Sequence, residues 1–156
     1  MLNIHIEKVI YDDLEAINDI SIDHWGDEGN YGFKRLKHLS DKGYSFCLKN
    51  NNEIVAFCIV DIDDDKCEIY LLAVKKGNEG KGYGTAIFGY AIQYARNNGF
   101  HLFTLHVNTS NKAAIHLYKK FDFKVNKYIK EYYSSDDIDN NDAYLMIHDD
   151  FDNTFI

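Results

Sequence analysis

Cysteine, long apolar runs and positive charge are all scarce in this sequence of 156 residues. The three cysteines, Cys47, Cys58 and Cys67, are odd in number and show no Cys-x-x-Cys spacing. Neither a disulfide framework nor a zinc site is therefore expected, and we predict buried free thiols and no metal.

No stretch of the chain approaches the roughly 20 consecutive apolar residues that a membrane-spanning helix needs. Residues 1–7 also lack the basic start and the apolar core of a secretory signal. These two absences predict a soluble, cytoplasmic protein without a membrane partner.

Positive charge is outnumbered, with 17 basic against 25 acidic residues and a net charge of -8. A nucleic-acid partner is therefore not expected, because phosphate binding needs clustered cations. The acidic balance fits a cationic or amine substrate, and it fits simple solubility equally well.

What the sequence does contain is enough apolar material for one core. Hydrophobic residues make up 46% of the chain, and no linker or repeat divides it, so we expect one domain over residues 1–156. Apolar and polar residues alternate over 2–10, which predicts a strand. Asp12 stands three residues before Glu15, which predicts a capping box for a helix that continues through Ile20.

The rest of the chain alternates between strand-like and helix-like patterns. The predicted order is a loop at 23–31, a helix at 33–39, strands at 44–48, 54–62 and 68–74, a glycine turn at 75–85 leading into a helix, a strand at 102–107, a helix at 111–121, and a hairpin of 123–133 with 144–147. This order predicts a mixed α/β sheet with one parallel crossover.

Glycines at positions 80, 82 and 84 mark the turn before the predicted helix. Glycine lets successive main-chain N–H groups converge, and a helix N-terminus favours phosphate. A plain glycine-rich cap is the alternative. No Lys-Ser or Lys-Thr pair follows Gly82, as a P-loop requires, and Gly84 comes one residue too early for the dinucleotide fingerprint. A pyrophosphate site of another kind remains.

Residues 79–84, Glu-Gly-Lys-Gly-Tyr-Gly, resemble the Gln/Arg-x-x-Gly-x-Gly signature of the GNAT superfamily of N-acetyltransferases. Residues 111–118, Asn-x-x-Ala-x-x-Leu-Tyr, followed by Phe123, resemble a second motif of that family, although Asp122 replaces its glycine. The resemblance covers residues 44–148. It implies the α/β (α+β) GNAT fold, which is a mixed, mostly antiparallel sheet of six to seven strands with four helices and a splayed central pair of parallel strands.

The resemblance also implies acetyl-CoA as the cofactor. The cofactor-binding residues that it implies are Leu72, Ala73, Val74, Glu79, Gly80, Lys81, Gly82, Tyr83, Gly84, Thr85, Asn111, Ala114 and Tyr118. Glu79 places a carboxylate where the family has a donor to the pyrophosphate. The candidates to supply the missing positive charge are Lys75, Lys76, Lys81 and Lys112.

Acetyl transfer to an amine needs a neutral amine, a site for the developing oxyanion and a proton for the departing thiolate. In similar enzymes the thioester carbonyl lies against the main chain of the strand before the glycine turn, here residues 72–74. Tyr118 resembles the family's general acid, and packing of its ring on the cofactor is the alternative. Glu68 and His106 are candidate bases acting through a water, although a lone strand histidine is often structural.

Tyr132 and Tyr133 resemble the tyrosine pair with which protein N-alpha-acetyltransferases and ribosomal-protein alanine acetyltransferases contact the substrate peptide. Trp25 and Tyr31 are expected to form the opposite wall of the substrate site. An aromatic hairpin core is the alternative for the pair.

Three functions remain open at this stage. The leading hypothesis is acetylation of a protein or peptide N-terminus by direct attack in a ternary complex. The second is acetylation of a small amine such as a polyamine or aminoglycoside, which Asp27 and Glu28 favour. The third, suggested by Glu79, is an acyl-CoA-binding module without catalysis. A monomer or a homodimer is expected.

Overall fold

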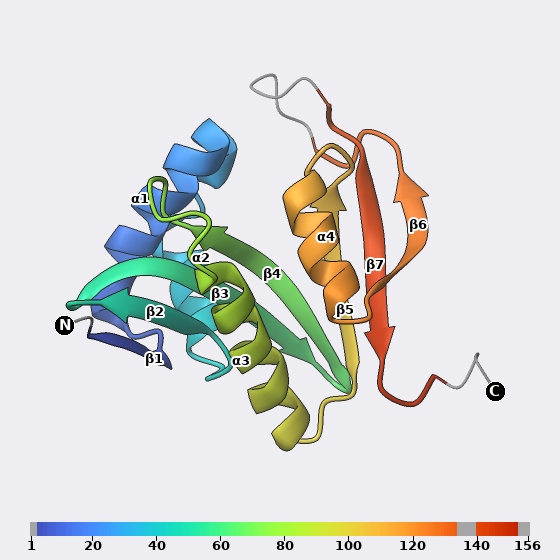
Figure 1. Cartoon of the computed structure of the whole chain (residues 1–156), viewed down its shortest axis with the longest axis horizontal. Coiled ribbons are helices and arrows are strands. Elements are labelled where there is room, and N and C mark those ends of the chain that lie inside the picture. Colours follow the sequence, from blue (N-terminus) through green and yellow to red (C-terminus); the bar gives the residue numbers. More distant parts are fainter. Residues whose placement is uncertain (1–2, 134–139, 153–156) are drawn as a thin grey trace.

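A sheet of seven strands forms the centre of the computed structural model, which describes residues 3–133 and 140–152 (Figure 1). The strands are β1 (Ile4–Lys8), β2 (Phe46–Asn50), β3 (Glu53–Asp63), β4 (Lys66–Val74), β5 (Leu102–Asn108), β6 (Lys124–Ile129) and β7 (Ala143–Asp149). Their order is β1-β2-β3-β4-β5-β7-β6, and among these described strands only β4 and β5 pair in parallel. The predicted fold class is confirmed.

The helices α1 (Leu14–Trp25), α2 (Gly32–Ser40), α3 (Tyr83–Asn97) and α4 (Lys112–Lys120) lie on both faces of the sheet (Figure 1). α1 and α2 bury one apolar side, including Ile17 and Leu36, against Phe57 of β3. α3 buries Ile87 and Phe88 on the opposite face, which it shares with α4. Within the described ranges, no helix is long and apolar enough to cross a membrane.

Tyr70 is the extra residue of a β-bulge in β4. Leu71 pairs with Ile59, but the next pair toward the start of β4 joins Ile69 to Val60, so Tyr70 has no partner on β3. A bulge reverses the face toward which the following side chains point. Ile69 accordingly packs in the α3 core, whereas Leu71 packs in the α1–α2 core. Pairing of β4 with β5 also ends at Ile69, so the parallel strands separate beside the bulge.

The predicted capping box at the start of the first helix was wrong. The side chain of Asp13, and not that of Asp12, accepts a hydrogen bond, from the Ile10 N–H at 2.9 Å. Asp13 is buried and lies 3.0 Å from the ammonium of Lys49, which fixes its position. Helix α1 therefore begins at Leu14, after a short 3-10 turn.

The predicted loop at 23–31 was also mostly wrong. α1 continues to Trp25, and a 3-10 helix, η2 (Gly26–Gly29), follows it. The α-helix ends where Gly26 adopts a φ of 62°, a conformation that L side chains rarely take. The loop is therefore reduced to the short passage between η2 and α2.

The predicted closing hairpin forms, with shorter strands. β6 ends at Ile129, so Tyr132 and Tyr133 lie in the connection to β7. Part of that predicted turn, residues 134–139, and the first two residues of the chain lie outside the described residues. Asp122 adopts a φ of 64°, the left-handed conformation that the family's glycine would favour there.

The three cysteines are free and buried, as predicted. Burial is the main cause that raises the pKa of Cys47 and of Cys67 to about 12. These thiols therefore remain protonated and behave as small apolar side chains.

Candidate active site

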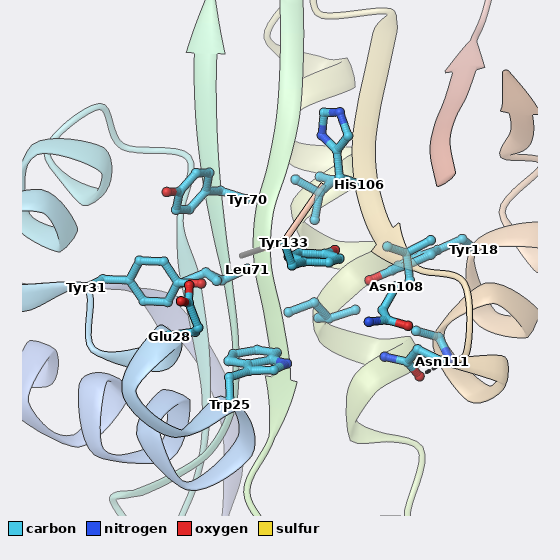
Figure 2. Close-up of a pocket in the computed structure, with 14 residues that line it drawn as sticks. Trp25, Glu28, Tyr31, Tyr70, Leu71, His106, Asn108, Asn111, Tyr118 and Tyr133 are labelled. Carbon is cyan, nitrogen blue, oxygen red and sulfur yellow. Dashed lines mark hydrogen bonds between the residues drawn. The ribbon is translucent and has the colours of Figure 1, made fainter. Parts of the chain in front are cut away.

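A cavity of about 220 Å³ lies where β4 and β5 separate (Figure 2). Trp25 and Tyr31 form one side, while His106, Tyr118 and Tyr133 line the other parts of the wall. The predicted cofactor residues Leu72, Asn111 and Ala114 line it as well. The structure thus brings together residues from both ends of the chain, and it adds Glu28, Tyr70 and Asn108, which were not among the predicted site residues.

A second hollow of about 280 Å³, the turn groove, lies between the glycine turn and α4. The predicted residues Val74, Glu79, Gly80, Gly82, Tyr83, Gly84 and Thr85 line it, whereas Lys81 does not. The α4 wall consists of Ala113, His116, Leu117 and Lys120. No sequence motif singled out His116 or Lys120, and their only signal is helical spacing from Ala113.

The glycine turn presents main-chain N–H groups to this groove. Gly80 and Gly82 have φ values of 76° and 83°, which L side chains rarely adopt. α3 begins directly afterwards without a side-chain cap, so the amides of its first turn are left for a ligand. The side chain of Tyr83 is buried in the core, so its main chain is the part that can serve an anion.

The open edge of β4 supplies further main-chain groups. The Lys75 N–H donates to the Val55 oxygen at 2.8 Å, and in an antiparallel ladder every second residue bonds to the same neighbour. The amide of Ala73 therefore faces β3, whereas the amides of Leu72 and Val74 face the separated side. Of the three predicted residues, two point their main-chain groups at the cleft.

His24, near the end of α1, bonds to this edge. Its Nε2 donates to the main-chain oxygen of Val74 at 2.6 Å. The bond attaches α1 to the last residue of β4, next to the glycine turn, and leaves the Val74 N–H on the open side.

Tyr118 is positioned by α4. Asn111 caps this helix, because its Oδ1 accepts the Ala114 N–H at 3.2 Å. The Tyr118 ring packs on Phe88 at a centroid distance of 5.2 Å, and its hydroxyl end points into the cavity in Figure 2. Burial raises the pKa of Tyr118, so the phenol stays protonated and can act as a proton donor.

His106 of β5 lines the cavity, and Glu68 of the parallel strand β4 lies beside it. His106 Nδ1 is 3.8 Å from Glu68 Oε2, which is too long for a direct hydrogen bond but close enough for the carboxylate to stabilise a positive charge on the imidazole. Burial lowers the pKa of His106, with a smaller contribution from Lys66, while Glu68 opposes the shift. The imidazole is therefore neutral at physiological pH and can accept a proton. Glu68 itself does not line the cavity.

Tyr31 is held in place by a buried asparagine. The Tyr31 N–H donates to Asn18 Oδ1 at 3.1 Å, and Asn18 Nδ2 donates to Asn30 Oδ1 at 3.0 Å. Burial, followed by the nearby Tyr70 and Glu28, raises the pKa of Tyr31 to about 12. The phenol is therefore a hydrogen-bond donor throughout the physiological range.

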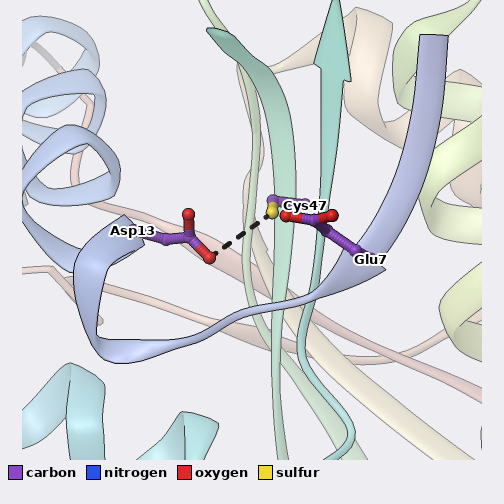
Figure 3. A group of neighbouring side chains, drawn as sticks. All are labelled: Glu7, Asp13 and Cys47. Carbon is purple, nitrogen blue, oxygen red and sulfur yellow. Dashed lines mark hydrogen bonds between the residues drawn. The ribbon is translucent and has the colours of Figure 1, made fainter. Parts of the chain in front are cut away.

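Glu7, Asp13 and Cys47 form a separate cluster between β1, the first turn and β2 (Figure 3). Their ligand atoms lie within 4.8 Å of one another, which would suit a metal ion. The Lys49 ammonium, however, contacts both carboxylates and supplies the positive charge. The cluster therefore acts as a partly buried ion-pair network that connects the two strands.

A groove for an anion next to a cavity with a proton acceptor and a proton donor defines an enzyme that transfers a group from a phosphate-bearing carrier. The chain matches the Acetyltransferase (GNAT) family over residues 10–123 and belongs to that family. It is an acetyl-CoA-dependent N-acetyltransferase.

Several known proteins are similar. An uncharacterized N-acetyltransferase of Methanocaldococcus jannaschii is 30% identical over 105 residues, which are 63% of this chain and 46% of that one. The [ribosomal protein bS18]-alanine N-acetyltransferase of Escherichia coli K12 is 29% identical over 102 residues, covering 65% and 68%. The crystal structure of the Escherichia coli ribosomal-protein-S18-alanine N-acetyltransferase gives a TM-score of 0.81 at 26% identity and covers 94% of each chain. Arabidopsis thaliana Naa50, solved with the bisubstrate analogue CoA-Ac-MVNAL, shares the fold, with a TM-score of 0.82 at 21% identity over 92% and 97%.

Proposed function

We propose that this enzyme acetylates the α-amine of a peptide or protein N-terminus. The observation that carries the proposal is the tyrosine pair at the cavity. Tyr133 lines it, the adjacent Tyr132 stacks on His106, and Tyr31 lies on the facing wall. Burial raises the pKa of all three phenols, so each remains an O–H donor suited to peptide carbonyl oxygens.

The cavity residues fit the steps of acetyl transfer. The donor supplies an acetyl group as a thioester. His106 takes the proton from the attacking amine through a water, and Glu68 stabilises the imidazolium that forms. Main-chain N–H groups on the open edge of β4, at Leu72 and Val74, stabilise the developing oxyanion. Tyr118 gives its proton to the departing sulfur and is restored by solvent.

An α-amine suits this site better than a lysine side chain does. The reference pKa of an α-amine is about 7.7–8.0, against about 10.4 for lysine, so a neutral imidazole can remove its proton more readily. Similarity to the Escherichia coli relative supports this choice, since that protein is named for an alanine of the ribosomal protein bS18.

Glu28 favours a second candidate function. It lines the cavity opposite Tyr118 and would pair with a second positive charge on a small diamine or polyamine (Figure 2). This alternative needs no tyrosine pair, because a polyamine has no carbonyl groups to bind.

The test is CoA-thiol release from acetyl-CoA with three acceptor sets. They are peptides with a free N-terminus and no lysine, the same peptides with a blocked N-terminus and one internal lysine, and polyamines. Turnover confined to the first set is expected, and Tyr133→Phe should raise KM for the peptide while leaving the acetyl-CoA KM unchanged. Turnover with polyamines alone would overturn the proposal and support the second candidate.

A further inference from the structure

The turn groove has two walls of different charge character. One wall is the glycine turn with the start of α3, and the other is the α4 face that repeats at positions 113, 116, 117 and 120. Among the described residues that line this groove, one is a lysine, Lys120, and one is a carboxylate, Glu79. An anion in the groove therefore meets one attractive and one repulsive side chain.

Glu79 cannot donate a hydrogen bond to the diphosphate of the acetyl donor. Its Oε1 accepts the neighbouring Asn78 N–H at 3.2 Å, so the carboxylate turns back onto the loop while remaining exposed to the groove. A carboxylate offers no N–H to a phosphate and repels it through its charge. The positive charge must come from elsewhere in the chain.

The four lysines predicted to supply that charge do not line the groove. Lys75 pairs with Glu53, and Lys76 lies 4.0 Å from Asp23. Lys112 lies 3.4 Å from the main-chain oxygen of Thr109, and Lys81 is exposed away from the lining. These predictions are therefore not supported by the positions of the side chains.

Lys120 meets the requirement. It lines the groove, and no carboxylate of residues 3–133 or 140–152 lies within ion-pair distance of it. It also lies in the most basic part of an acidic chain, because residues 112–130 contain six lysines and one acidic residue, Asp122. His116, one turn earlier on the same wall, adds a ring N–H donor.

We propose that the diphosphate of the acetyl donor is held between the amides at the start of α3 and the ammonium of Lys120, with His116 as a further donor. Glu79 weakens this grip and so speeds the departure of CoA. The inference rests on the acetyl-CoA dependence of the enzyme and not on the choice of acceptor, so its failure and that of the proposed function are separable.

The first experiment is calorimetric titration of CoA into the intact protein. Lys120→Gln should weaken CoA binding about tenfold, because a hydrogen bond to a charged group is lost. Lys119→Gln is the matched control, since this neighbouring lysine is exposed and does not line the groove, and it should change the affinity by less than about twofold. Glu79→Gln should tighten binding and slow CoA dissociation in stopped-flow measurements.

Ligand fragments identify the group that Lys120 contacts. Dephospho-CoA keeps the diphosphate and lacks the 3′-phosphate, whereas pantetheine lacks both. Lys120→Gln should weaken dephospho-CoA as much as CoA and leave pantetheine unaffected. The proposal is overturned if only CoA is weakened, if Lys119→Gln has an equal effect, or if Lys120→Gln binds CoA as the wild type does. Unchanged thermal midpoints exclude misfolding as the cause.

Discussion

The imidazole of His106 lies parallel to the phenol ring of Tyr132, with ring centroids 4.4 Å apart and 8° between the ring planes. Tyr132 therefore shields one face of the imidazole from water. Since burial is the main cause of the lowered pKa of His106, the tyrosine keeps the imidazole neutral and able to accept a proton.

Removing this cover should raise the pKa of His106. In Tyr132→Ala we expect a shift toward the ordinary imidazole value of about 6.5, because the charged form regains water. Glu68→Gln should shift it the other way, since the carboxylate favours the charged form. The measurement is an NMR titration of the imidazole Cε1 proton. Tyr11→Ala, at an exposed tyrosine that packs on Phe33, is the control, and a lowered pKa in Tyr132→Ala would contradict the explanation.

Tyr118→Phe should separate catalysis from binding. Loss of the hydroxyl removes the proton donor and should lower kcat on the order of 10²-fold. The ring that packs on Phe88 remains, so the affinity for CoA should stay within about twofold of the wild type. Steady-state kinetics measure kcat, and Tyr44→Phe, at a tyrosine packed on Tyr94, serves as the control. An unchanged kcat would remove Tyr118 from the mechanism.

Asn18→Ala should make Tyr31, on the cavity wall, less firmly held, although Asn18 itself does not line the cavity. The variant loses the bond to the Tyr31 N–H and the bond to Asn30, which should lower the free energy of unfolding by about 1–3 kcal/mol. We expect KM for the acceptor to rise more than KM for acetyl-CoA. Asn18→Asp keeps the acceptor for the Tyr31 N–H, so its stability and its acceptor KM should lie between those of the wild type and Asn18→Ala. Equal effects on both KM values would indicate general destabilisation instead.

Asp150 should govern part of the acid stability. Burial alone would raise its pKa, but hydrogen bonds from Arg96, His101 and His148 outweigh burial and hold the pKa well below the usual range. The stabilisation is present above the unfolded pKa of about 3.9 and is lost as the pH falls through the lower folded pKa.

Asp150→Asn should therefore lower stability by about 1–3 kcal/mol at pH 7 and flatten its decline below pH 4. Urea denaturation between pH 7 and pH 2 measures both effects. Asp65→Asn, at an exposed turn residue, should reproduce the wild-type curve. If Asp150→Asn keeps the full acid dependence, other carboxylates are responsible.

Local periodicity and spacing predicted the strands along the chain and the glycine turn, and the resemblance to the GNAT family predicted most of the residues that meet at the cavity. It could not predict the bulge at Tyr70, since every second residue of β4 from Cys67 to Ala73 is buried and the alternation looks unbroken. The burial partners change between Ile69 and Leu71, and only tertiary packing reveals that change.

Other errors have the same physical origin. Asp13, and not Asp12, is buried at the start of α1 because it pairs with Lys49, 36 positions later in the chain. A local sequence pattern does not contain that contact. Lys120 and His116 face the groove because α4 packs against the start of α3, and the charge of a lysine does not indicate its direction. The predictions that depended on side-chain direction were therefore the weakest.

The bulge at Tyr70 also has a consequence for how the acceptor side of the enzyme can diverge. The fully buried residues before the bulge, Cys67 and Ile69, pack in the α3 core, whereas those after it, Leu71 and Ala73, pack in the layer formed by α1 and α2, which carries Trp25 and Tyr31. Mutations in α1 and α2 can accumulate against Leu71 and Ala73 without disturbing Cys67 or Ile69. Since Leu72 and Val74 stay packed on the α3 side, the wall that carries Trp25 and Tyr31 can change its acceptor while the β4 amides that serve the donor keep their positions.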